Sequence, residues 1–147
     1  MNRRPFLQSA LLLGALLAGC SPANQARAPE AAAEYATDRD SAQGLFRVSY
    51  RSDPAPVPVG KLHRWTLHIT RADGTPVTGA TIEIDGDMPE HRHGLPTRPR
   101  VTRELGAGDY LVEGLKFQMG GWWVMDFDIR SAEGHADRVR FHLRLAS

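Results

Sequence analysis

The chain has 147 residues, with 18 Lys and Arg against 17 Asp and Glu, and its formal net charge is +1. This length suits a single domain with a core of useful size. The balanced charge excludes a general electrostatic attraction to nucleic acid. Because the chain has one cysteine, an internal disulfide and a cysteine-rich zinc site are excluded as well. Any metal chemistry must therefore use His, Met and carboxylate side chains.

The first residues have the features of an export signal. Arg3 and Arg4 precede the apolar run Leu11–Leu17, in the order of the charged and hydrophobic regions of a signal peptide. The run is too short to span a membrane as a helix. It leads into Leu17-Ala18-Gly19-Cys20, which has the pattern of a bacterial lipobox. The sequence therefore predicts a lipoprotein signal peptide over residues 1–19 and lipid modification of Cys20, the first residue of the mature protein.

The predicted lipid anchor is followed by a segment of low apolar content. Residues 20–43 are rich in Ala, Pro and charged side chains and contain a single aromatic residue. Such a segment buries little surface, so we expect a flexible tether between the membrane and the domain. Ser21 rather than Asp follows the cysteine. We therefore expect a protein of the cell envelope that faces the periplasm and is held to the outer rather than the inner membrane.

From residue 44 onward the sequence changes to short runs in which apolar and polar residues alternate, separated by Pro and Gly. This period of two is typical of strands with one buried face. About seven strands are expected, at residues 45–50, 64–70, 80–85, 100–105, 110–115, 122–130 and 138–145. The pattern predicts an all-β domain over 44–147, an immunoglobulin-like antiparallel β-sandwich. An up-and-down barrel is the alternative.

The segment Asp85–Thr97, between two of the expected strands, is rich in residues that bind metals. It contains Met88, His91 and His93, and thioether and imidazole groups favour copper, above all Cu(I), over calcium or magnesium. If this segment is extended, both imidazole rings lie on one side of the backbone, with Arg92 on the other. The alternative is a polar surface loop whose histidines bind nothing.

Two residues near position 120 extend this hypothesis. Met119 lies in a Gly-rich turn between strands, and turns at one end of a sandwich can converge, so Met119 is a fourth candidate ligand. Its alternative role is a hydrophobic plug in a bend. Trp122 and Trp123 point to opposite faces of their strand, and parity places Trp123 in the core. Trp122 is then either a lid on a pocket near Met119 or an exposed contact for a protein partner.

Catalysis is not expected. An enzyme needs a positioned acid, base or nucleophile in a concave site, and the sequence has no G-x-S-x-G, no H-E-x-x-H and no Gly-rich phosphate loop. Asp126 and Asp128 lie on the outward face of their strand, where carboxylates are usually solvated.

The run from His93 to Trp123, together with the loop before it, resembles the FixH-like and YtkA-like families of exported bacterial proteins. The shared features are a Met-Pro-x-His-x-His-type loop, a Gly-x-Tyr turn and a Met-x-Gly-x-Trp corner, over about residues 80–130. Members are small sandwich domains, often lipoproteins. FixH-like proteins are associated with copper delivery to haem-copper oxidases, and related CopC-type sandwiches bind copper through His and Met. The ligands that the resemblance implies are Met88, His91, His93 and Met119.

The chain departs from these families in two ways. Relatives often have Met where this chain has Leu95, and the long transmembrane segment of FixH is not present. The resemblance therefore predicts a membrane-tethered periplasmic copper carrier or buffer without catalysis, whose partner is a copper acceptor. The alternative is a structural lipoprotein that binds another envelope protein through a sandwich face or through the Trp122 edge.

Overall fold

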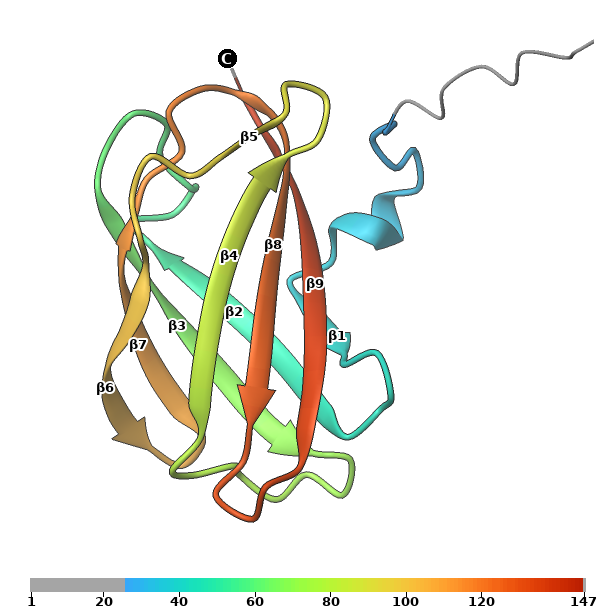
Figure 1. Cartoon of the computed structure of the whole chain (residues 1–147), viewed down its shortest axis with the longest axis vertical. Coiled ribbons are helices and arrows are strands. Elements are labelled where there is room, and N and C mark those ends of the chain that lie inside the picture. The colour runs from blue at the N-terminus through green and yellow to red at the C-terminus, as the bar shows by residue number, and fades with distance from the viewer. Residues whose placement is uncertain (1–25, 147) are drawn as a thin grey trace, which may run out of the picture.

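The computed structural model describes residues 26–146, so the predicted signal peptide and Cys20 lie outside the described residues. The described residues form two antiparallel sheets packed face to face (Figure 1). The strand order is β1-β2-β3-β7-β6 in the five-stranded sheet and β5-β4-β8-β9 in the four-stranded sheet. The predicted antiparallel β-sandwich is confirmed. No helix among the described residues is long and apolar enough to cross a membrane.

The elements follow the chain in this order: η1 (Ala32–Tyr35), β1 (Asp38–Asp40), β2 (Phe46–Asp53), β3 (His63–Arg71), β4 (Thr81–Met88), β5 (His93–Gly94), β6 (Arg100–Gly106), β7 (Asp109–Leu115), β8 (Gly121–Arg130) and β9 (Ala136–Leu145). The seven expected strands are β2, β3, β4, β6, β7, β8 and β9. The two that were not expected, β1 and β5, have three and two residues, which is too short for an alternating pattern to show.

The core lies between the two sheets and is rich in aromatic side chains. The largest side chains with less than 2% exposure include Trp65, Trp123, Phe117, Phe127 and Phe141. Burial of such rings contributes most of the hydrophobic stabilisation of a domain of this size. Trp123 is fully buried, which confirms the parity argument for this residue. Its position near the start of β8 places it at the end of the sandwich where β5 lies (Figure 1).

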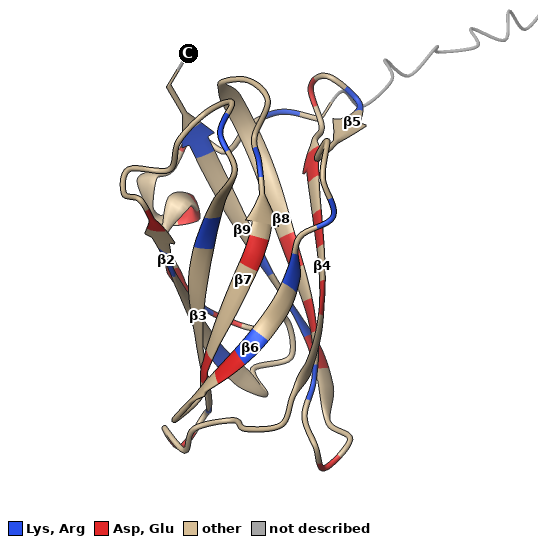
Figure 2. Cartoon of the chain, turned by 90° about the vertical axis from the view of Figure 1, so that its left-hand side faces the viewer, with Lys and Arg blue, Asp and Glu red and all other residues tan. Residues whose placement is uncertain are grey.

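Charged residues lie mainly on the outer faces of the strands. Figure 2 shows acidic residues at intervals along β4. On the adjacent strands, Arg138 and Arg140 of β9 bind Asp128 and Asp126 of β8 through two hydrogen bonds each, with N–O distances of 2.6–2.7 Å. Asp126 is thus held in an ion pair, and its side chain is only 17% exposed. Two ion pairs thus connect β8 and β9 on the outer face of this sheet.

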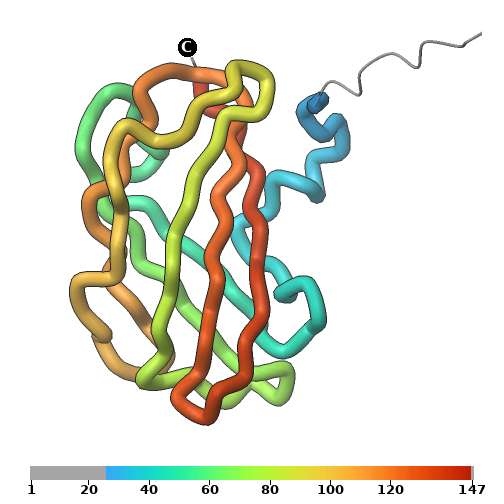
Figure 3. Tube along the Cα trace, viewed as in Figure 1, coloured from blue at the N-terminus to red at the C-terminus, as the bar shows by residue number. Residues whose placement is uncertain are grey.

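The N-terminal part of the domain differs from the expected tether. Residues 38–40, within the segment 20–43 that was predicted to be flexible, form β1, which pairs with β2. Just after β1, the Ala42 N–H donates to the Arg138 carbonyl of β9 at 2.8 Å. Figure 3 shows this part of the chain running beside β9. β1 and the residues after it therefore join the two sheets along one edge, and regular structure begins before residue 44, where the domain was predicted to start.

A buried carboxylate holds this connection. Asp137 of β9 is 6% exposed and accepts hydrogen bonds from Ser41 Oγ at 2.6 Å, from the Gln43 N–H at 3.0 Å and from the Leu45 N–H at 3.3 Å. Burial alone would raise the pKa of Asp137, but these hydrogen bonds and that from the Arg138 N–H outweigh it, so the pKa lies below its ordinary value. We call Ser41, Gln43, Leu45 and Asp137 the N-terminal latch.

Candidate metal centre

The two histidines of the candidate site lie on the hairpin between β4 and β5. Met88 ends β4, and His93 of β5 is its direct partner in the antiparallel register. The N–H groups of His91 and Arg92 both donate to the Met88 carbonyl at 2.9 Å, which closes a tight turn. Arg92 has a φ of +57°, in the left-handed region that ends many such turns. The segment around Arg92 is therefore not extended, so the condition under which alternation alone would place both rings on one side is not met.

The turn nevertheless brings the two imidazoles together. The ring centroids of His91 and His93 are 5.9 Å apart, with a tilt of 33° between the planes. His91 is exposed, whereas His93 is partly buried. Two rings at this separation need only modest side-chain rotation to direct one nitrogen each at a shared ion.

The ring of His93 is held in place from two sides. It meets the Trp123 ring edge-on with centroids 5.6 Å apart. Its Nδ1 lies 2.9 Å from the Gln118 Nε2 and 3.3 Å from the Gly94 carbonyl oxygen. Among the described residues no hydrogen bond is made by the other ring nitrogen, Nε2. These contacts fix the ring, and they correspond to opposite tautomers. When Nδ1 donates its proton to the Gly94 carbonyl, the Nε2 lone pair is free for a ligand, whereas donation from Gln118 Nε2 to Nδ1 places the ring proton on Nε2.

Met119 lies on the turn that crosses this end of the sandwich between β7 and β8 (Figure 1). The Trp123 Nε1 donates to the Met119 carbonyl at 3.0 Å, and the preceding residue, Gln118, is the one that contacts His93. The Met119 side chain is 38% exposed. The structure thus places the Met119 turn directly against the histidine hairpin, with a thioether open to solvent.

Met88 occupies a different environment. It is fully buried within the core, on the same side of the hairpin as His93, because direct cross-strand partners share a face. Its methyl group packs on the backbone of Gly121, where an added Cβ would lie 2.4 Å from the Met88 Cε. Met88 therefore lies beneath His93 as a packing residue, and of the four predicted ligands it is the one without solvent access.

No group of three or more His, Cys, Asp or Glu side chains in residues 26–146 is arranged to hold a metal ion. A site at this end would therefore be built from the two imidazoles and thioether sulfur. Such a donor set suits a soft ion of low coordination number and not a hard ion such as magnesium.

Comparison with known proteins identifies the domain. The family model of YtkA-like proteins matches residues 46–127, more than half of the chain, from the start of β2 into β8. The chain belongs to the YtkA-like family. This confirms the expected resemblance to YtkA-like proteins. The candidate metal centre lies within the matched region, whereas β1 and β9 lie outside it.

The YtkA-like domain is also similar to a solved structure of a DUF4426 family protein from Pseudomonas aeruginosa PAO1. The TM-score is 0.53 at 14% sequence identity, and the match covers 74% of this chain and 94% of that one. At this identity the similarity supports the sandwich fold alone. A search of the curated proteins gives no match.

Trp122 is not the exposed residue that sequence reasoning allowed. It is 5% exposed, its Nε1 donates to the His142 Nδ1 at 3.1 Å, and its ring stacks on that of His142 with centroids 5.8 Å apart. His142 of the neighbouring strand covers the indole, so Trp122 offers no free face to a protein partner. Burial, followed by the positive charge of Arg39, lowers the pKa of His142, which keeps the ring neutral and able to accept this hydrogen bond.

Two residues at the candidate centre were not found from the sequence as part of it. Gln118 is 25 positions from His93, and Trp123 was assigned to the core without its contact to the histidine. Neither contact produces a local pattern, because each depends on how the β7–β8 turn crosses the end of the sandwich. The only signal was that Gln118 adjoins Met119 in the sequence.

Proposed function

We propose that this YtkA-like protein is a copper carrier or buffer of the periplasm that works without catalysis. His91 and His93 would be the principal ligands and Met119 the thioether ligand. The observation that supports the proposal most directly is the separation of 5.9 Å between the two imidazole rings, on a hairpin with the Met119 turn packed against it. Two neutral imidazoles and a thioether are donors that Cu(I) prefers.

The exposure of the proposed ligands suits a carrier. His91 and Met119 are exposed, so an acceptor protein can approach the ion from outside. His93 is anchored on Trp123 and Gln118, which gives the site one fixed ligand and two adaptable ones. An ion held by adaptable surface ligands can be exchanged stepwise with a partner that offers similar donors.

The place of action follows from the N-terminal sequence. Lipid on Cys20 would hold the domain at the outer rather than the inner membrane, facing the periplasm. The chain between Cys20 and β1 would set the distance over which the proposed copper centre can search for its acceptor. The alternative function is binding of an envelope protein through a sandwich face or the Trp122 edge, and the burial of Trp122 removes the support for the second of these surfaces.

A competition titration tests the proposal. Every described strand and the whole core lie between residues 38 and 145, so residues 26–147 contain the complete folding unit. This domain would be titrated with Cu(I) against a chromogenic chelator at neutral pH, beside the double variant His91→Ala/His93→Ala. The matched control is His135→Ala, an exposed histidine in the turn between β8 and β9 at the opposite end of the sandwich.

We expect binding of one Cu(I) per chain that is lost in the double variant and retained in the control. Met119→Leu, which keeps the size of the side chain and removes the sulfur, should weaken binding by about tenfold if the thioether is a ligand. Equal Cu(I) binding by the double variant and the unmodified domain would refute the proposed centre.

A further inference from the structure

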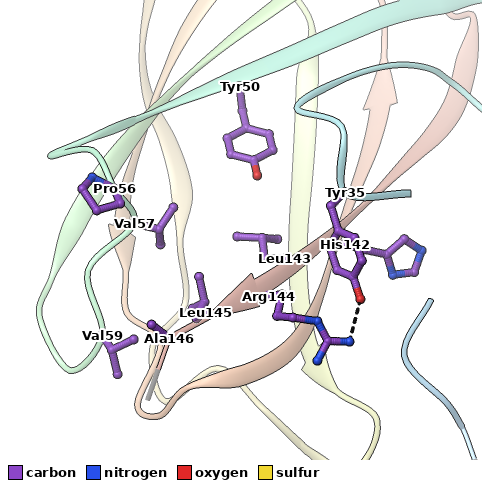
Figure 4. A pocket seen from close by; sticks show the side chains of 10 residues that line it. All are labelled: Tyr35, Tyr50, Pro56, Val57, Val59, His142, Leu143, Arg144, Leu145 and Ala146. Carbon is purple, nitrogen blue, oxygen red and sulfur yellow. Dashed lines mark hydrogen bonds between the residues drawn. The ribbon is translucent and has the colours of Figure 1, made fainter. Parts of the chain in front are cut away.

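A groove separate from the candidate metal centre lies where β2 and β9 face each other. Its volume is about 630 Å³, and it is formed by the end of β9, the loop after β2 and Tyr35 of η1. Figure 4 shows the side chains that line it. The groove lies beside the part of the β9 edge that β1 and the residues after it do not cover. Along the edge of β9, the Arg138 carbonyl accepts a hydrogen bond from the Ala42 N–H and the Arg140 carbonyl accepts one from Arg39 Nη1. The groove begins after Arg140, where these hydrogen bonds end.

The walls of the groove are mainly apolar. Pro56, Val57 and Val59 come from the loop after β2, and Leu143, Leu145 and Ala146 come from the end of the chain. A groove of this size with hydrophobic walls and a few polar groups has the usual character of a site for a small apolar or amphipathic molecule. The identity of the ligand then depends on the polar groups.

One polar group lies on the floor. The ring of Tyr50 is 8% exposed and stacks on Trp65 with centroids 4.1 Å apart, and its hydroxyl points into the groove (Figure 4). No hydrogen-bond partner for this hydroxyl occurs among residues 26–146. Because burial raises the pKa of Tyr50 to about 12, the group keeps its proton and is a free donor. The hydroxyl itself is not enclosed, so water or the polar end of a ligand in the groove can accept its hydrogen bond.

The second polar group lies at the rim and carries a charge. Arg144 is exposed, and its Nη2 donates to the Tyr35 hydroxyl at 3.0 Å, with the guanidinium 5.5 Å from the centre of that ring. Within the described part of the chain Arg144 forms no ion pair, in contrast to Arg138 and Arg140 of the same strand. Tyr35 thus holds an uncompensated cation in place beside an apolar groove.

We propose that this groove binds a single fatty acid with a chain of about twelve carbons. Its hydrocarbon chain lies against the apolar walls, and its carboxylate binds the Arg144 guanidinium at the rim. A carboxylate matches one unpaired guanidinium in charge and geometry. A single chain suits the volume, whereas a phospholipid brings two chains and a larger head. The proposed fatty-acid site is independent of the proposed copper centre.

Calorimetric titration of residues 26–147 with laurate below its micelle concentration tests this proposal, with dodecanol as the ligand that has the same chain and no charge. We expect saturable binding of one laurate per chain. Arg144→Gln should weaken laurate binding by about tenfold and dodecanol binding by less than about twofold. The matched control is Arg103→Gln, which removes an exposed arginine from β6 in the other sheet.

A second pair of variants consists of one that blocks the groove without changing the core and one that serves as its control. Ala146→Trp places a large side chain at the exposed rim and should abolish binding of both ligands, whereas Ala72→Trp, at an exposed turn elsewhere, should leave binding unchanged. Unchanged laurate binding in Ala146→Trp, or an equal loss for laurate and dodecanol in Arg144→Gln, would overturn the proposal.

Two other occupants would be revealed by titration of the acylated full-length chain and by sedimentation. If the acylated full-length chain binds no laurate while residues 26–147 do, the lipid of the chain itself occupies the groove and the assignment to a free fatty acid is wrong. A dimer in sedimentation experiments that Ala146→Trp dissociates would assign the groove to a second copy of the chain, with the same consequence.

Discussion

The hairpin between β4 and β5 that carries His91 and His93, called here the histidine hairpin, and the N-terminal latch are both held by hydrogen bonds. The two regions differ in whether these bonds stabilise only a local turn or the packing of the whole domain. At the hairpin, two backbone N–H groups close a turn on the Met88 carbonyl, and the side chains of interest extend from an exposed loop. At the latch, a buried carboxylate satisfies donors that come from another part of the chain. Changes at the first region should therefore alter ligand binding and spare the fold, whereas changes at the second should do the opposite.

The largest effect is expected for Asp137→Ala. This change leaves the Ser41 hydroxyl and the N–H groups of Gln43 and Leu45 without their acceptor, at an estimated cost of about 2–4 kcal/mol in the free energy of unfolding. Urea unfolding of residues 26–147, followed by tryptophan fluorescence, measures this loss. Asp128→Ala, which breaks an exposed ion pair with Arg138, should cost less than about 1 kcal/mol. Similar losses for the two variants would show that the latch adds no special stability.

A smaller effect is expected from pH. The folded pKa of Asp137 lies below its ordinary value of 3.8, so the charged form favours folding at pH values above 3.8. That contribution is lost as the pH falls below 3.8 and through the lowered pKa of the folded state. The unfolding free energy of Asp137→Asn should therefore decline less steeply between pH 5 and pH 2 than that of the unmodified domain. Parallel declines in the two proteins would contradict a lowered pKa for this group.

The smallest effect on stability is expected at the hairpin. His91→Ala/His93→Ala removes one exposed and one partly buried ring and no backbone hydrogen bond of the turn. The free energy of unfolding without metal should change by less than about 1 kcal/mol. Thermal melting with and without Cu(I) would separate the two roles, because bound metal should raise the melting temperature of the unmodified domain and not that of the variant. A strongly destabilised variant would instead indicate that the histidines serve the fold.

These two regions also differ in how far the sequence predicts them. The seven longer strands were found because each is long enough for alternation to show, and His91 and His93 were found because they are two positions apart in a loop. The latch joins Ser41 to Asp137, which are 96 positions apart, and Asp137 looks like an ordinary polar residue at the start of a strand. The groove polar groups, Tyr50 and Arg144, come from different sheets, so only the packing of the two sheets brings both to one groove.

Trp122 shows a limit of a different kind. Period-two alternation correctly places it opposite Trp123, on the outer face of the sheet, but a face that points outward is not always exposed. The neighbouring side chain of His142 stacks over the indole and accepts its hydrogen bond. Parity predicts the direction of a side chain and carries no information about what covers it.

The position of β1 has a mechanical consequence. In a chain anchored through Cys20, any movement of the membrane relative to the domain would pull on the backbone just before residue 38. That residue begins β1, which lies antiparallel to β2 and is paired with it along its whole length. A pull along the strand must break its hydrogen bonds together and not one after another. β1 and the latch that follows it would then bear the force applied at the anchor. That force would not be transmitted to the histidine hairpin.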